Sequence, residues 1–78
     1  MNNIKNAVRK FSNANNHSRA VIESVMIAPY YGAAPQQGYR LLVADHNGFV
    51  YHVSCYETIG DAEYHLQHDC GHGFTRVA

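Results

Sequence analysis

The sequence predicts a single α+β domain over residues 1–78, in the order α-β-β-β-α-β, with two helices packed on one face of a mainly antiparallel sheet. Three observations lead to this prediction: an apolar stripe at helical spacing near the start, two β-rich runs around Asn47-Gly48, and a capped helical segment near the end. A chain of 78 residues has room for one domain. Its zero net charge and 15% charged residues argue against bulk disorder.

The first expected helix carries apolar residues at i, i+3, i+4 and i+7 and basic residues on its other side. The apolar stripe consists of Ile4, Ala7, Val8 and Phe11. The basic side consists of Lys5, Arg9 and Lys10. Because so short a helix is unstable alone, we expect it to dock on the sheet.

Residues 19–28 read RAVIESVMIA and are rich in β-branched side chains, which favours a strand. A helix capped by Ser18 is the alternative for this segment. Residues 29–38, PYYGAAPQQG, contain two prolines and two glycines and are therefore expected to form a loop. That loop carries two adjacent tyrosines, Tyr30 and Tyr31, with no evident role in a core.

Asn47-Gly48 separates two β-rich runs, residues 39–45 and 49–56, and this pattern predicts a β-hairpin. A two-residue turn would pair Leu42 with Val53. A three-residue turn shifts the register by one and gathers apolar and amphipathic side chains on one face: Tyr39, Leu41, Val43, Phe49, Tyr51, Val53 and Cys55. We expect burial to select this second register, with Gly48 in the left-handed conformation.

Thr58 and Asp61 resemble a capping box and mark the start of the second helix. Its buried stripe is expected to be Ile59, Ala62, Leu66 and Cys70. Gly71 or Gly73 ends the helix, and residues 74–77 form a short final strand.

Charge is segregated along the chain, because the first nineteen residues hold no acid and the acids near the end have no base among them. The two interpretations are a pair of solvated faces of opposite sign, or a bipolar surface that orients the protein on a partner. The zero net charge argues against a generic DNA binder, which is usually strongly basic. It argues equally against a mimic of DNA, which must be strongly acidic.

A zinc site is one candidate, because His65, His68, Cys70 and His72 lie within eight residues. Their spacing matches no established zinc motif, so we expect exposed histidines and buried thiols, and no cofactor. Neither Cys55 nor Cys70 is placed to form a reactive thiolate, and no phosphate loop or acid–base pair appears. We therefore expect no enzymatic activity.

Residues 49–78 have the order strand, short acidic helix with a Thr-x-x-Asp cap, and terminal strand of the form Gly-Phe-x-Arg-Val. In this order, and at the positions Thr58, Ala62, Leu66, Phe74, Arg76 and Val77, the segment resembles small bacteriophage host-takeover proteins, including the phage inhibitor of bacterial RNA polymerase and several anti-CRISPR proteins. The resemblance implies a non-enzymatic inhibitor that blocks a site on a large bacterial complex. It does not extend to the first 48 residues, and it leaves the target open.

The sequence thus favours a protein-binding module that inhibits by occupancy, with a bacterial protein or ribonucleoprotein as partner, in the cytoplasm of the bacterial host. The candidate contact residues are Tyr30, Tyr31, Lys5, Arg9 and Lys10. Direct nucleic-acid binding is not expected, since a strand and not a second helix follows the basic helix, and the predicted aromatic rings lie on the sheet face that the helices cover. Membrane insertion is not expected, since no 18-residue apolar run occurs. The alternatives are a histidine-rich zinc domain and a nucleic-acid-binding accessory protein; a homodimer formed through a sheet edge is a further possibility.

Overall fold

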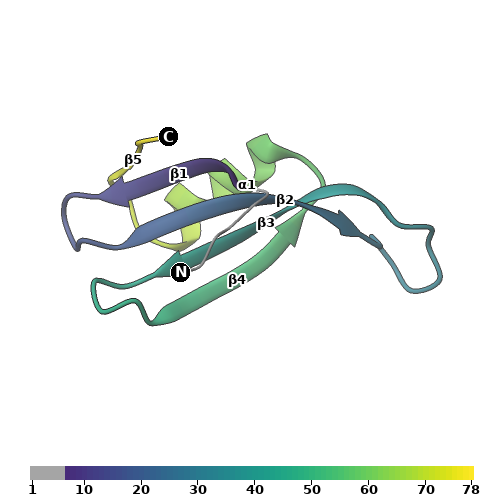
Figure 1. The fold of residues 1–78 in the computed structure, drawn as a ribbon, viewed down its shortest axis with the longest axis horizontal. Helices are drawn as coiled ribbons and strands as arrows, with labels where there is room; N and C mark the ends of the chain where they lie inside the picture. The colour runs from purple at the N-terminus through teal and green to yellow at the C-terminus, as the bar shows by residue number, and fades with distance from the viewer. Residues whose placement is uncertain (1–6) are drawn as a thin grey trace.

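The computed structural model describes residues 7–78, which form five strands and one helix (Figure 1). The elements are β1 (Ala7–Asn13), β2 (Arg19–Ile27), β3 (Gln36–Ala44), β4 (Val50–Tyr56), α1 (Ile59–Asp69) and β5 (Phe74–Arg76). The strands form one sheet in the order β4-β3-β2-β1-β5, and every neighbouring pair is antiparallel. The α+β character expected from the sequence is present, but the predicted order of elements is wrong.

The first segment is a strand, not a helix, and this is the main correction. Along β1, Lys10 is exposed while Arg9 and Phe11 lie on the side of α1, so the side chains alternate with a period of two. In a strand, positions i and i+4 lie on one face and positions i+3 and i+7 lie on the other. The same spacing is therefore compatible with a strand that carries apolar side chains on both faces. Pairing with β2 on one side and β5 on the other supplies the hydrogen bonds that an isolated short helix lacks. The predicted helix positions Ile4 and Lys5 lie outside the described residues.

The prediction of a strand over residues 19–28 is confirmed by β2, which pairs with β3 along nine residues. The loop of residues 28–35 closes this hairpin. In Figure 1 the hairpin extends to the right, beyond the other strands. Gly38 lies opposite Val25 in this pair, and a Cβ built on Gly38 would clash with the side chain of Ile27. The close approach of Ile27 to the backbone is therefore possible only because residue 38 has no side chain.

The β3–β4 hairpin has the predicted three-residue turn, His46-Asn47-Gly48. The amide of Asp45 donates to the carbonyl of Phe49 at 3.0 Å, and Gly48 has φ +84°. One residue later the ladder slips: Ala44 pairs with Val50, but Val43 pairs with His52, which leaves Tyr51 as an extra residue. Beyond this β-bulge Leu42 pairs with Val53, the pairing expected for the two-residue turn.

The predicted common face of the hairpin is therefore wrong. Tyr39, Leu41 and Val43 lie under α1, where they are opposite Tyr56, Ser54 and His52. Val53 and Cys55 lie on the other face of the sheet. The bulge exchanges the two faces of β4 because side chains alternate at every residue of a strand.

Helix α1 covers one face of the sheet, with Thr58 as its N-cap. The Thr58 hydroxyl accepts from the amide of Asp61 at 3.1 Å, which confirms the predicted cap. Ala62 and Leu66 are fully buried and Cys70 is nearly so, as the predicted stripe requires. The core comprises Phe11, Ala20, Ile22, Leu41, Val43, Ala62, Leu66, Cys70 and Phe74. The fold has two layers, and the structure describes one helix where two were predicted.

Candidate functional site

The sheet face opposite α1 has no covering layer among residues 7–78, and Figure 1 shows this face toward the viewer with the helix behind it. We call it the open face. Ala20, Ile22, Leu41 and Val43 point to the core, so their neighbours along each strand point to the open face. The open face consists of Lys10, Ser12, Arg19, Val21, Glu23, Val25, Arg40, Leu42, Ala44, Val50, Val53 and Cys55.

The strand registers arrange these side chains in rows that cross the sheet. The central row runs Lys10–Val21–Leu42–Val53, so a cation at β1 is followed by three aliphatic side chains. The next row runs Ser12–Arg19–Ala44–Val50. Directly opposed side chains in antiparallel strands lie about 4.5–5.5 Å apart at Cβ, so each row is a continuous surface. Val53, at the end of the central row, is 58% exposed.

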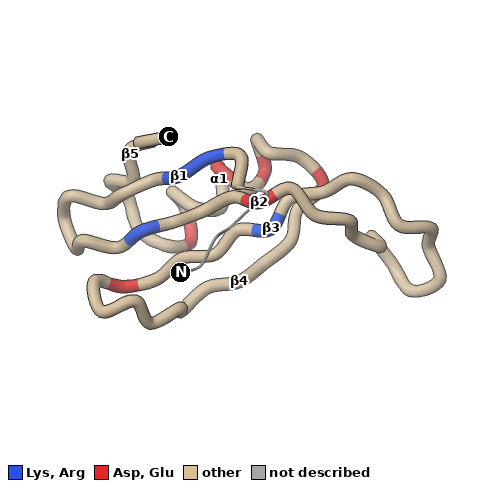
Figure 2. Tube along the Cα trace, in the orientation of Figure 1, with Lys and Arg blue, Asp and Glu red and all other residues tan. Residues whose placement is uncertain are grey.

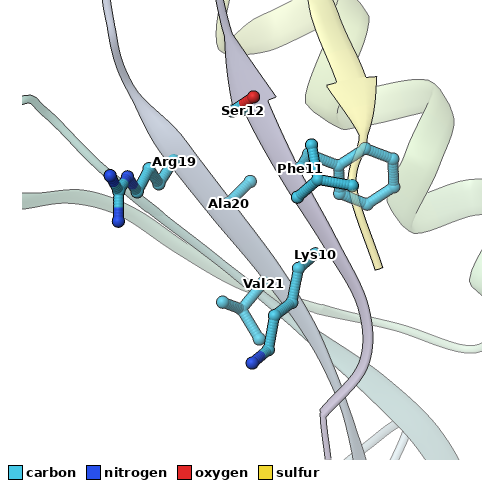
Figure 3. Close-up of a pocket in the computed structure, with 7 residues that line it drawn as sticks. Lys10, Phe11, Ser12, Arg19, Ala20 and Val21 are labelled. Carbon is cyan, nitrogen blue, oxygen red and sulfur yellow. The ribbon is translucent and has the colours of Figure 1, made fainter.

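Where these two rows cross β1 and β2, their side chains surround a depression of about 390 Å³. Figure 3 shows the side chains of Lys10, Arg19 and Val21 around it, and Val77 completes its wall. Neither Lys10 nor Arg19 forms a salt bridge with an acid of the described chain. The third cation of this face, Arg40, donates through Nε to Glu23 at 2.7 Å. Two cations beside an aliphatic floor are therefore available to an incoming acidic group.

The two signs of charge are partly separated between the layers, although Arg9 and Arg76 lie with the acids on the α1 side and Glu23 lies on the open face. Lys10, Arg19 and Arg40 lie on the open face, while four of the acids lie on α1 and in the turn that leads into it: Glu57, Asp61, Glu63 and Asp69. In Figure 2 the blue segments lie on the strands, and most of the red segments lie along α1 and the turn that leads into it. The segregation seen along the sequence thus becomes a partial polarity, in which the open face carries more cations than acids.

The predicted contact residues do not form one cluster. Arg9 lies on the α1 side and forms an ion pair with Glu63, whereas Lys10 lies on the open face. Lys5 lies outside the described residues. Tyr30 is 72% exposed and Tyr31 is fully exposed, both in the loop after β2. Lys10 pairs with Val21, so this loop begins about 20 Å further along β2.

Histidines gather at the end of α1 but do not converge on a metal site. His65 and His68 contact the carboxylate of Asp69 through Nδ1, at 2.7 and 2.9 Å. These hydrogen bonds, first that of His68 and then that of His65, hold the pKa of Asp69 below its usual range. The rings of Tyr56 and Tyr64 stack on His65 and His68. Within residues 7–78 no group of three or more histidine, cysteine or acidic side chains is arranged to hold a metal ion.

The two cysteines lie in different environments. Cys70 faces the core, as predicted, and burial raises the pKa of its thiol, with a smaller effect from the charge of Asp69. Cys55 is exposed on the open face, so its predicted burial is wrong, and the β4 bulge is the reason. Cys70 is therefore turned away from the histidines that would have to join it in a zinc site.

The composition of the open face was not predicted, because Lys10 was expected on a helix and Val53 and Cys55 were expected on the buried face of the hairpin. A usable signal was present: hydrophobic residues occupy both alternating sets in residues 20–27 and 39–44, as in strands that meet apolar groups on two sides. Tyr30 and Tyr31 were correctly placed in a loop.

Comparison with known proteins found no matching family model, no matching curated protein and no matching solved structure. In the part of the chain that the structure describes, no helix is long and apolar enough to span a membrane. The open face and the loop of residues 28–35 are therefore the features from which a function can be inferred.

Proposed function

We propose that this chain is a non-enzymatic protein-binding module that docks an acidic, partly apolar surface of a partner protein on its open face. The observation that carries the proposal is the central row Lys10–Val21–Leu42–Val53, flanked by Arg19. Aliphatic side chains on an uncovered sheet offer apolar area to a partner. Cations without an internal acid partner favour a partner of opposite charge and exclude basic ones.

A protein fits this surface better than a nucleic acid does. Sheets that bind single-stranded RNA stack bases on exposed aromatic rings of central strands. The central strands β2 and β3 present Val21, Val25, Leu42 and Ala44 to the open face, and none of these has a ring. The net charge of the whole chain is zero, whereas phosphate-binding domains are usually basic.

Tyr30 and Tyr31 provide a second contact in this proposal. Tyrosine is enriched among the residues that dominate binding energies. Because its side chain has only two torsion angles, little conformational entropy is lost when a partner orders it. The loop lies at the end of the projecting β2–β3 hairpin, so a partner can reach both rings without disturbing the core (Figure 1).

Inhibition by occupancy follows from the size of the domain and from the resemblance of residues 49–78 to phage host-takeover proteins. A standard interface covers about 800 Å² on each partner, and an 8.7 kDa domain can supply that area and block a site. We propose a bacterial complex of the CRISPR-effector or RNA-polymerase type as the target class.

The first experiment is an affinity capture from a nuclease-treated bacterial lysate, followed by a binding measurement with the captured partner. The double variant K10E/R19E is expected to weaken binding by tenfold or more. R76E is the matched control, because Arg76 is an exposed cation that lies opposite Phe11, on the α1 side. Equal affinity of wild type and K10E/R19E would overturn the proposed site.

The role of the loop is tested separately with Y30A/Y31A. Phe49 is an exposed aromatic residue at the other end of β3, so F49A is the matched control. Weaker binding by Y30A/Y31A alone supports the loop contact. Binding that disappears with nuclease treatment would instead favour a nucleic-acid partner and contradict the proposal.

A further inference from the structure

The two edges of the sheet differ in how they are protected. One edge is β5, which is only three residues long. The other edge is β4, seven residues long, and no segment within residues 7–78 pairs with its outer side. In Figure 1 β4 forms the lower border of the sheet, and α1 lies behind the strands without extending past that border.

Strand β4 lacks most of the features that prevent edge strands from pairing. Its sequence, VYHVSCY, contains no lysine, arginine, aspartate, glutamate or proline. Val50, Tyr51, Val53 and Cys55 are all exposed. The bulge at Tyr51 disturbs one end of the strand, but the stretch from His52 to Tyr56 is a regular ladder. Along these five residues every second one turns its backbone amide and carbonyl away from β3, so the edge presents unpaired donors and acceptors.

We infer that β4 is a self-association edge, along which a second copy of this chain adds its own β4 in antiparallel orientation. The partner is a second copy because charge permits it: a strand without ionised side chains meets itself without repulsion, and two chains of zero net charge do not repel each other at long range. A two-fold axis makes such a contact self-complementary.

The register follows from the regular stretch, whose middle residue is Ser54. A two-fold axis at Ser54 places Val53 of each copy opposite Cys55 of the other, both on the open face. The result is a ten-stranded sheet whose two open faces lie side by side. This inference goes beyond the proposed function and does not depend on it, because it concerns the free protein.

The contact is expected to be weak, since one strand edge buries less than the area of a standard interface. Sedimentation velocity between about 10 and 500 µM is the appropriate measurement. Wild type is expected to change from 8.7 kDa toward twice that mass as concentration rises. A protein that stays at 8.7 kDa over the whole range would overturn the inference.

Variant V53K locates the contact, because it places two ammonium groups on diagonal positions of the shared ladder. It is expected to weaken self-association at least tenfold. Circular dichroism and thermal unfolding check that V53K remains folded, which the exposure of Val53 favours. M26K is the matched control, since Met26 is an exposed apolar residue of β2 away from this edge. Equal dimerisation of V53K and M26K would exclude β4 as the contact.

Variant V53C tests the register independently. The new thiol lies opposite the natural Cys55 of the second copy, so mild oxidation is expected to give a covalent dimer within the non-covalent one. M26C has no such partner and serves as the control. A dimer that V53C does not crosslink would overturn the register, and therefore the two-fold axis at Ser54.

Discussion

The guanidinium of Arg9 in β1 forms an ion pair with the carboxylate of Glu63 in α1, and so connects the sheet to the helix that covers it. Both side chains are about one-third exposed, at 29% and 34%. Glu63 lies between Ala62 and Tyr64, one buried and one exposed, at the border of the helix–sheet contact. The pair therefore adds a polar link between α1 and β1 at the border of the helix–sheet contact.

Reversing one charge of this pair is expected to destabilise the domain modestly. A partly exposed ion pair contributes about 0.2–1 kcal/mol, and R9E adds repulsion to that loss. Urea unfolding of R9E, E63R and the double variant R9E/E63R measures the interaction. The double variant should recover most of the stability that the single variants lose. Strictly additive losses would mean that the two charges do not interact.

Leu66 is the largest fully buried side chain of α1, at 0% exposure, and its truncation should be costly. We expect L66A to lower the free energy of unfolding by about 2–5 kcal/mol, through lost burial and the cavity left behind. Small domains have about 5–15 kcal/mol in total, so partial unfolding of L66A is expected at 37 °C. M26A, at an exposed site, should unfold within about 0.5 kcal/mol of wild type.

Asp69 is expected to make stability depend on acid pH. Its pKa in the folded chain is lowered from the usual 3.8 by hydrogen bonds from His68 and His65. The stability that this carboxylate contributes is therefore complete above pH 3.8 and is lost as pH falls through the lower folded value. Unfolding curves of wild type and D69N should differ most near neutral pH and converge well below pH 3.8. A difference that grows in acid would contradict the assigned hydrogen bonds.

The two thiols should react at different rates with a thiol reagent such as Ellman's reagent. Cys55 is exposed, while Cys70 is buried and has a raised pKa, so the native protein should show one fast and one slow phase. Denaturation should make both thiols fast. C55S should remove only the fast phase, and a fast reaction of Cys70 in the native protein would mean that the end of α1 opens readily.

The C-terminal half of the fold could be predicted because local signals there agree. Thr58 as a cap, the stripe of Ala62 and Leu66, and the glycines after the helix each predict the same boundaries, and φ is +106° at Gly71 and +104° at Gly73. The turn before β4 was predictable for the same reason, since Asn47-Gly48 determines its geometry locally.

The first strand could not be predicted from its own residues, because its three apolar positions, Ala7, Val8 and Phe11, suit a helix as well as a strand. The choice depends on pairing with residues 19–23 and 74–76, which are distant in sequence. Asn13 gives a related lesson. Asparagine usually lies in caps and turns, but Asn13 is buried at the end of β1, where it donates to the carbonyl of His72 at 3.0 Å and accepts from the amide of Asn15.

The open face and the site on it were unpredictable for a further reason, the slip at Tyr51. No residue in VYHVSCY is a typical bulge residue such as glycine. The apolar character of Val53 and Cys55 therefore favoured the prediction that both lie in the core. The structure instead places two polar side chains, Ser54 and His52, half-buried on the helix side of β4 and leaves Val53 and Cys55 exposed on the other face.

The bulge at Tyr51 gives this hairpin two different ways to diverge. If a descendant lost Tyr51, His52 would follow Val50 directly, and the pairs Ala44–Val50 and Val43–His52 would join into one regular ladder with both faces unchanged. If instead the chain kept its length and the bulge closed, every later pair would shift by one residue, so Val53 and Cys55 would turn inward while Ser54 and His52 turned outward. Substitutions that regularise the ladder would therefore replace the surface of β4 in one step, whereas loss of the extra residue would preserve it.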